Sequence, residues 1–170
     1  MRLINGHTIE EASRITADIF AGVIREKPDA VLGLATGSTP IGLYEALTDD
    51  YRTGLLDFSR VSTINLDEYV GLSRQHEQSF GYFMDKHFFS RVNIPEENIM
   101  LIDGNGDPDA QADRYEAFFD NRSIDVLILG IGNNGHIGFN EPESVFRMKT
   151  HRVALVESTI EANSRFFASK

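Results

Sequence analysis

A glycine-rich loop over residues 130–142 holds the side chains whose types and spacing best suit acid–base chemistry. His136 and Glu141 lie five positions apart in this loop, which also contains four glycines. An imidazole titrates near neutral pH and can carry a proton, while a nearby carboxylate can orient it. A purely structural histidine is the alternative. The glycines favour catalysis, because so flexible a loop costs conformational entropy and is seldom kept without a use.

A second stretch, Thr36-Gly37-Ser38-Thr39-Pro40, has the composition of a phosphate site. It places small hydroxyl groups and a glycine at a predicted helix N-terminus, where free N–H groups and the helix dipole attract anions. The alternative is a well-capped helix without a ligand, with Thr39 as N-cap and Pro40 at the first helical position. No lysine follows the glycine as in a Walker A loop, which argues against nucleoside triphosphate chemistry.

Two further charged side chains are candidates. Asp67, in Asn65-Leu66-Asp67-Glu68-Tyr69, follows a predicted strand and could act as a general base if partial burial raised its pKa. The alternative is a pair of acids that simply solvates a loop. Arg165, in the last predicted helix, could hold a phosphate through two parallel hydrogen bonds, or could be a solvated surface arginine. The remaining histidines show no shared metal-ligand spacing, so no metal site is expected.

The elements that must position these residues alternate between helix and strand. Apolar runs predict strands over residues 30–35, 61–66, 99–102, 124–129 and 151–156. Helical periodicity and start signals, including capping boxes at Thr8 and Ser158, predict helices over residues 8–27, 39–51, 78–89, 107–118 and 158–167. This alternation predicts an α/β fold with a parallel sheet, in one domain spanning residues 1–170. Because ligands bind beyond the carboxyl ends of parallel strands, we expect the three loops to converge.

The spacing Gly130-x-Gly132-x-x-Gly135 matches the dinucleotide-binding fingerprint. That fingerprint must open a helix, whereas Gly138, Asn140 and Pro142 follow here and disfavour one. A dinucleotide cofactor is therefore not expected.

The composition excludes other classes of protein. The net charge of −10 disfavours non-specific binding to nucleic acid or an anionic membrane, and the absence of cysteine excludes disulfide scaffolds and thiolate chemistry. No apolar stretch approaches membrane-spanning length, and the N-terminus lacks the pattern of a signal peptide. The sequence predicts a soluble cytoplasmic protein.

Four stretches together resemble glucosamine-6-phosphate deaminase. They follow the order of that family with similar spacing, and they are Leu34-Ala35-Thr36-Gly37-Ser38-Thr39-Pro40, Asn65-Leu66-Asp67-Glu68-Tyr69-Val70-Gly71-Leu72, Gly132-Asn133-Asn134-Gly135-His136-Ile137-Gly138-Phe139-Asn140-Glu141-Pro142 and Ala162-Asn163-Ser164-Arg165-Phe166-Phe167. The resemblance implies a Rossmann-like open, mostly parallel sheet with helices on both faces. It also implies conversion of glucosamine 6-phosphate to fructose 6-phosphate and ammonia, without a cofactor.

The resemblance assigns roles to the candidate residues. Asp67 would move a proton between C1 and C2 of the opened sugar, and His136 would assist ring opening with Glu141 orienting it. The groups implied to hold the phosphate are Thr36, Gly37, Ser38, Thr39 and Arg165. A sugar phosphate is thus the expected partner, and oligomeric state is not predicted.

Two departures from the family stand out. Asn134 occupies a position where part of the family has an aspartate, so proton sharing with His136 would rest on Glu141 alone. Family members also extend beyond Lys170 with further strands, helices and a phosphate-binding lysine, so we expect a fragment or truncated relative with an exposed sheet edge. The alternatives are a 6-phosphogluconolactonase-type hydrolase and a non-catalytic sugar-phosphate-binding domain.

Overall fold

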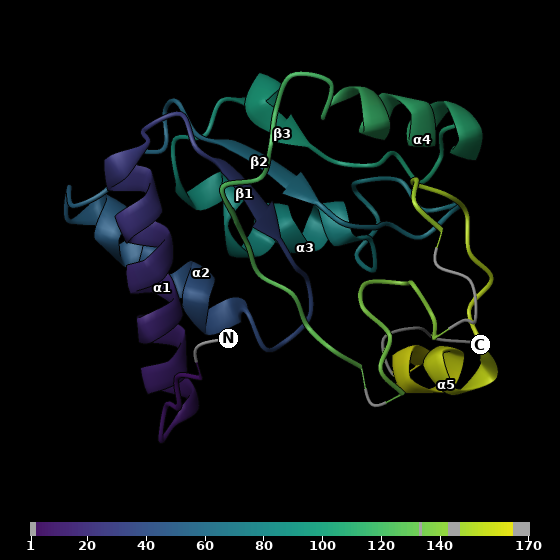
Figure 1. Ribbon diagram of the computed structural model, residues 1–170, viewed down its shortest axis with the longest axis horizontal. Coiled ribbons are helices and arrows are strands. Elements are labelled where there is room, and N and C mark those ends of the chain that lie inside the picture. The colour runs from purple at the N-terminus through teal and green to yellow at the C-terminus, as the bar shows by residue number, and fades with distance from the viewer. Residues whose placement is uncertain (1–2, 133, 143–146, 165–170) are drawn as a thin grey trace.

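The computed structural model describes residues 3–132, 134–142 and 147–164, in which helices and strands alternate along the chain (Figure 1). The elements are α1 (Ile9–Glu26), β1 (Val31–Leu34), α2 (Ile41–Arg52), β2 (Ser62–Asn65), α3 (Phe80–His87), η1 (Phe89–Arg91), η2 (Glu96–Asn98), β3 (Ile99–Met100), α4 (Pro108–Ala117), β4 (Val126–Leu127) and α5 (Glu157–Ser164). The predicted α/β class is confirmed. None of the described helices is both long enough and apolar enough to cross a membrane.

The four described strands form one parallel sheet in the order β3-β2-β1-β4. β1 pairs with β2 along its whole length, so that Leu34 lies opposite Asn65. On its other side β1 pairs with β4, with Leu32 opposite Val126. The strand order therefore reverses beside β1. This is the place where open α/β sheets bind their ligands, beyond the carboxyl ends of the strands.

Helices cover both faces of the sheet, as the resemblance implied. Leu32 points to the face covered by α1, α2 and α3, where Tyr44 stacks on Phe88 with ring centroids 5.2 Å apart. Val31 points to the opposite face and packs in a smaller cluster with Tyr115 of α4. Successive strand residues alternate between the two faces, which explains why the buried strands have continuous apolar sequences.

The strand predicted over residues 151–156 is wrong. These residues are described and contain no strand. Their apolar alternation has another cause, because Val153 and Leu155 face a cavity beside α4 instead of a neighbouring strand. The other four predicted strands are present but shorter than their apolar runs.

The helix starts follow the predicted chemistry with two corrections. Thr8 accepts a hydrogen bond from the N–H of Glu11 at 3.1 Å, as the capping box predicted. The prediction that Thr39 caps α2 is wrong, because Pro40 is the N-cap and makes no side-chain hydrogen bond. The carbonyl of Pro40 accepts the N–H of Tyr44 at 3.1 Å, which moves the helix start to Ile41. The predicted cap at Ser158 is also wrong, because α5 begins one residue earlier, at Glu157.

Candidate active site

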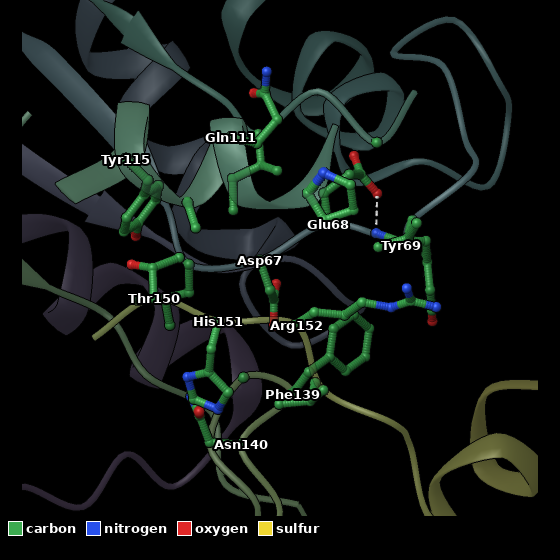
Figure 2. Close-up of a pocket in the computed structure, with 18 of the residues that line it drawn as sticks. Asp67, Glu68, Tyr69, Gln111, Tyr115, Phe139, Asn140, Thr150, His151 and Arg152 are labelled. Atoms are coloured by element: carbon green, nitrogen blue, oxygen red, sulfur yellow. Dashed lines mark hydrogen bonds between the residues drawn. The ribbon is translucent and has the colours of Figure 1, made fainter. Parts of the chain in front are cut away.

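Two cavities open beyond the carboxyl ends of the strands, and Asp67 lines both. The cavity that we name the Asp67–His136 cavity has a volume of about 460 Å³ and is lined by residues that follow β1, β2 and β4. The other, the Asp67–Tyr115 cavity, has a volume of about 450 Å³ and lies beside α4 (Figure 2). Both volumes suit small-molecule ligands. The predicted convergence of the three loops is confirmed at the Asp67–His136 cavity.

The loop after β1 contributes Thr36, Gly37 and Ser38 to the Asp67–His136 cavity. Gly37 has a φ of +99°, a conformation that glycine adopts without the steric cost other residues incur. The buried side chain of Tyr44 anchors the loop from behind, because its hydroxyl donates to the carbonyl of Ala35 at 2.5 Å. Thr39 is exposed and is not among the described residues that line this cavity.

Asp67 lies two residues beyond the end of β2, between the two cavities. The backbone N–H of Phe139 donates to its carboxylate. Gly138 passes so close that a Cβ atom there would lie 3.0 Å from Oδ2 of Asp67. Burial, and then the adjacent charge of Glu68, raise the pKa of Asp67 to about 7. Such a carboxyl group can take up and release a proton near neutral pH, which is what a general base requires.

The loop that carries His136 is folded around its glycines. Gly135 and Gly138 have φ angles of +91° and +59°. The N–H of Gly132 donates to the carbonyl of His136 at 2.8 Å, and the imidazole ring lies directly over Gly132. A Cβ atom at Gly132 would come within 2.2–2.5 Å of three ring atoms. In the described residues no helix opens at this loop, consistent with its rejection as a dinucleotide fingerprint.

Asn134 connects His136 to Glu141. Its amide nitrogen donates to Oε2 of Glu141 at 2.8 Å, and its amide oxygen lies 2.6 Å from Nδ1 of His136. Because a carboxylate only accepts, this orientation of the amide requires Nδ1 of His136 to carry the proton. Nε2 of the neutral ring is then the free acceptor. The direct distance between Nδ1 of His136 and Oε2 of Glu141 is 4.0 Å, so Asn134 is the immediate partner.

Asn134 lies between His136 and Glu141, and Thr159 of α5 binds the Glu141 side chain. Its side chain is 5% exposed. Oε1 accepts the hydroxyl of Thr159 at 2.5 Å and, more weakly, the N–H of Val156 at 3.4 Å. Burial alone would raise the pKa of Glu141, but the hydrogen bonds from Thr159, Asn134 and Val156 outweigh it and lower the pKa below its ordinary value. The carboxylate therefore stays ionised.

Three aromatic rings separate the two cavities. Tyr69 packs on Phe80 and on Phe139 with ring centroids 4.9 Å apart in each case, and Phe80 stacks on Phe139 at 5.5 Å. Tyr69 and Phe139 line both cavities. This wall joins the loop after β2, the start of α3 and the His136 loop.

Two polar residues of this region are not predicted from the sequence. Thr159 follows the predicted capping residue Ser158, and its hydroxyl binds Glu141. Glu68 was grouped with Asp67 as an acid of the loop, although it binds the start of α3. Arg165, the predicted phosphate-binding cation, lies outside the described residues. Within the described ranges no cluster of His, Asp or Glu side chains could hold a metal ion.

The model of the family described as glucosamine-6-phosphate isomerases/6-phosphogluconolactonase matches residues 5–165. The chain belongs to this family. Within it, the chain is 49% identical to a glucosamine-6-phosphate deaminase of Lachnoclostridium phytofermentans, covering 98% of the chain and 72% of the relative. It is 50% identical to glucosamine-6-phosphate deaminase 2 of Bacillus subtilis, covering 98% of the chain and 68% of the relative.

Solved structures of the family support the fold. A monomeric glucosamine-6-phosphate deaminase superposes with a TM-score of 0.95 at 45% identity, covering 99% of this chain and 71% of that structure. A 6-phosphogluconolactonase from Thermotoga maritima superposes with a TM-score of 0.66 at 22% identity, covering 80% of this chain and 61% of that structure. The second similarity concerns the fold alone. Family membership confirms the Rossmann-like architecture that the resemblance implied.

Proposed function

We propose that this protein converts glucosamine 6-phosphate into fructose 6-phosphate and ammonia, as an enzyme of amino-sugar breakdown. One observation carries the proposal. Asp67, whose pKa is raised to about 7 by burial and then by Glu68, lines the same 460 Å³ cavity as His136 and the loop of Thr36 and Ser38. The identity of about 50% to named glucosamine-6-phosphate deaminases supports the same reaction. Because its substrate is a phosphorylated sugar, which does not cross membranes freely, we place the enzyme in the cytoplasm.

The phosphate is proposed to bind at the loop after β1. Thr36, Gly37 and Ser38 line the cavity just before α2. N–H groups and the positive end of the helix dipole at α2 can stabilise the negative charge of a phosphate locally, even in a protein with a net charge of −10. Thr39 and Arg165 remain proposed ligands from the family resemblance.

Ring opening is assigned to His136. With Nδ1 donating to Asn134, Nε2 can exchange a proton with the sugar ring, whose C1 hydroxyl must lose a proton while its ring oxygen gains one. Asn134 can orient the imidazole but cannot accept its proton. The ionised Glu141 accepts from the Asn134 amide and so keeps the amide oxygen turned toward His136.

Asp67 is assigned the isomerisation. As a carboxylate it removes the proton from C2 of the open aldehyde, and the electron pair forms the C1–C2 double bond as the aldehyde oxygen is protonated. The same carboxyl group returns the proton to C1, which leaves an imine at C2. Water adds to the imine and ammonia leaves. Overall one water is consumed and one ammonia is released for each sugar, and a base with a pKa near 7 suits both directions of proton transfer.

Product analysis with three substrates tests the proposal. Incubation with glucosamine 6-phosphate should yield ammonia and fructose 6-phosphate in equal amounts, whereas unphosphorylated glucosamine should yield neither. Hydrolysis of 6-phosphogluconolactone without ammonia release would favour a lactonase. Tight binding of the sugar phosphate without turnover would favour a non-catalytic binding domain.

A further inference from the structure

The residue next to Asp67 fastens the loop after β2 to a helix. We propose that Glu68 is a positioning residue for Asp67, which ties the Asp67 loop to the first turn of α3 and holds a fixed negative charge beside the reacting carboxyl group. This inference rests on the function proposed above, in which Asp67 moves the sugar proton. It gives Glu68 a role of its own, distinct from that of a second acid in the loop.

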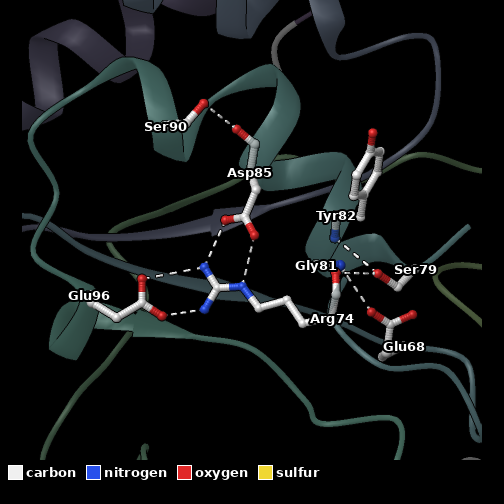
Figure 3. A network of polar contacts seen from close by, with 8 residues as sticks. All are labelled: Glu68, Arg74, Ser79, Gly81, Tyr82, Asp85, Ser90 and Glu96. Carbon is white, nitrogen blue, oxygen red and sulfur yellow. Dashed lines mark hydrogen bonds and ion pairs between the residues drawn. The ribbon is translucent and has the colours of Figure 1, made fainter. Parts of the chain in front are cut away.

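The contacts of Glu68 are directed at backbone N–H groups. Oε1 accepts the N–H of Tyr69 at 2.8 Å (Figure 2) and that of Phe80 at 3.0 Å. Oε2 accepts the N–H of Gly81 at 3.0 Å (Figure 3). The first N–H groups of a helix have no partner within the helix, and a carboxylate also interacts favourably with the helix dipole there. Glu68 therefore connects the end of β2 to α3 across twelve positions of the chain.

The helix end to which Glu68 binds is itself held firmly. Ser79 accepts the N–H of Tyr82 at 3.0 Å and donates its hydroxyl to the carbonyl of Arg74 at 2.9 Å. The guanidinium of Arg74 binds both carboxylate oxygens of Asp85, at 2.7 and 2.9 Å, and pairs with Glu96 (Figure 3). A planar guanidinium between two carboxylates fixes both orientation and distance. The Asp67 loop is thus attached to a rigid support.

The charge of Glu68 acts on Asp67 directly. Two adjacent carboxylates disfavour ionisation of each other, and after burial the charge of Glu68 is the second cause of the raised pKa of Asp67. Burial raises the pKa of Glu68 as well, and the hydrogen bonds from three backbone N–H groups oppose that rise. The titratable or charged groups that face Asp67 or share a cavity with it are Glu68, Tyr69, Tyr115, Glu116, His136, Arg147, Lys149, His151 and Arg152, together with Glu77 and Asp103.

Two substitutions test the charge of Glu68 and its attachment to α3. Glu68→Gln removes the charge and, because an amide nitrogen cannot accept, also one of the contacts with backbone N–H groups. Glu68→Asp keeps the charge but withdraws it from the helix. We expect Glu68→Gln to lower the pKa of Asp67 in a carboxyl ¹³C NMR titration and to move the acidic limb of ammonia release to lower pH. We expect Glu68→Asp to keep that pKa raised while the amides of Phe80 and Gly81 exchange about tenfold faster. Glu97→Gln, a matched change at an exposed position outside this network, should alter neither quantity.

The proposal is overturned if Glu68→Gln leaves the pKa of Asp67 unchanged, or if Glu68→Asp leaves both amides as protected as in the wild type. Should Glu68→Gln fail to fold, amide exchange in Glu68→Asp decides alone. Both measurements are made without substrate turnover. A lack of ammonia release by the wild type would therefore contradict the proposed function, while the NMR data would still decide the role of Glu68.

Discussion

The amide oxygen of Asn134 lies 2.6 Å from Nδ1 of His136, closer than any carboxylate oxygen of Glu141 to that nitrogen. The sequence led us to expect that proton sharing with His136 would rest on Glu141 alone. Instead a neutral amide orients the imidazole. Glu141 acts through this amide, because it accepts a second hydrogen bond from the amide nitrogen at 2.8 Å. An amide cannot change its protonation state here, so the arrangement fixes a single tautomer of His136.

Removing the Asn134 side chain should therefore damage catalysis more than folding. We expect Asn134→Ala to lower kcat about 100-fold, because the imidazole loses the group that fixes its orientation and tautomer. Steady-state kinetics and a thermal melt measure the two effects. Asn121→Ala, at an exposed position after α4, is the control. A kcat for Asn134→Ala within twofold of the wild type would contradict the role of the amide.

Gly132 is expected to tolerate no side chain. A Cβ atom there would lie 2.2–2.5 Å from the His136 ring, so Gly132→Ala must displace the imidazole. A displacement of about 1 Å can cost about 100-fold in rate, and we expect a loss of that size. Gly22→Ala on α1, where a Cβ meets nothing within 4 Å, is the matched control and should keep full activity. Equal activities of the two variants would show that the ring does not need its present position.

The hydroxyl of Thr159 is expected to hold Glu141 in place. Thr159→Val keeps the shape of the side chain but removes the donor to a buried carboxylate, a contact of a kind that contributes about 1.5–3 kcal/mol. We expect about a tenfold lower kcat and a lower melting temperature. Thr159→Ser retains the hydroxyl and should recover most of the activity. Equal kcat values and melting temperatures for Thr159→Ser and Thr159→Val would contradict this role of the hydroxyl.

Asp67 should make stability and activity depend on pH in opposite directions. Its folded pKa of about 7, raised by burial and then by Glu68, lies above the ordinary value of 3.8, so the folded state binds this proton more tightly than the unfolded chain does. The stabilisation is complete below about pH 4 and is lost as the pH rises to about 7. We expect Asp67→Asn to be more stable than the wild type at pH 8, by on the order of 2–4 kcal/mol, but not at pH 4.

Urea unfolding of the wild type and Asp67→Asn at both pH values measures this difference. Asp120→Asn, at an exposed position, serves as the control for the loss of a carboxylate. A stability gain of Asp67→Asn that is the same at both pH values would contradict the raised pKa.

The sequence predicted the parts of the site that depend on sheet geometry. Asp67 and His136 converge because each follows a parallel strand, and all such ends lie at one edge of the sheet. It could not predict contacts that depend on tertiary packing. Thr159 lies in a helix start, and only the folded chain shows that its hydroxyl faces Glu141.

Two local sequence patterns gave wrong predictions, one of a strand over residues 151–156 and one of the first residue of α2. The alternation of Val153 and Leu155 indicates an extended segment with one buried side, and a cavity wall satisfies it as well as a strand does. Thr39 and Pro40 form a plausible helix start on propensity alone. The turn at Gly37 and the hydrogen bond to the Pro40 carbonyl shift that start by one residue.

Ammonia release by the wild type and by Asp67→Asn, measured side by side at pH 8 with glucosamine 6-phosphate, tests the central claim most directly. We expect turnover by the wild type and a loss of at least about 100-fold in the variant, because a general base of this kind contributes 10²–10⁴-fold. Calorimetry should show that the variant still binds the sugar phosphate. Ammonia release by Asp67→Asn within tenfold of the wild type would contradict the account.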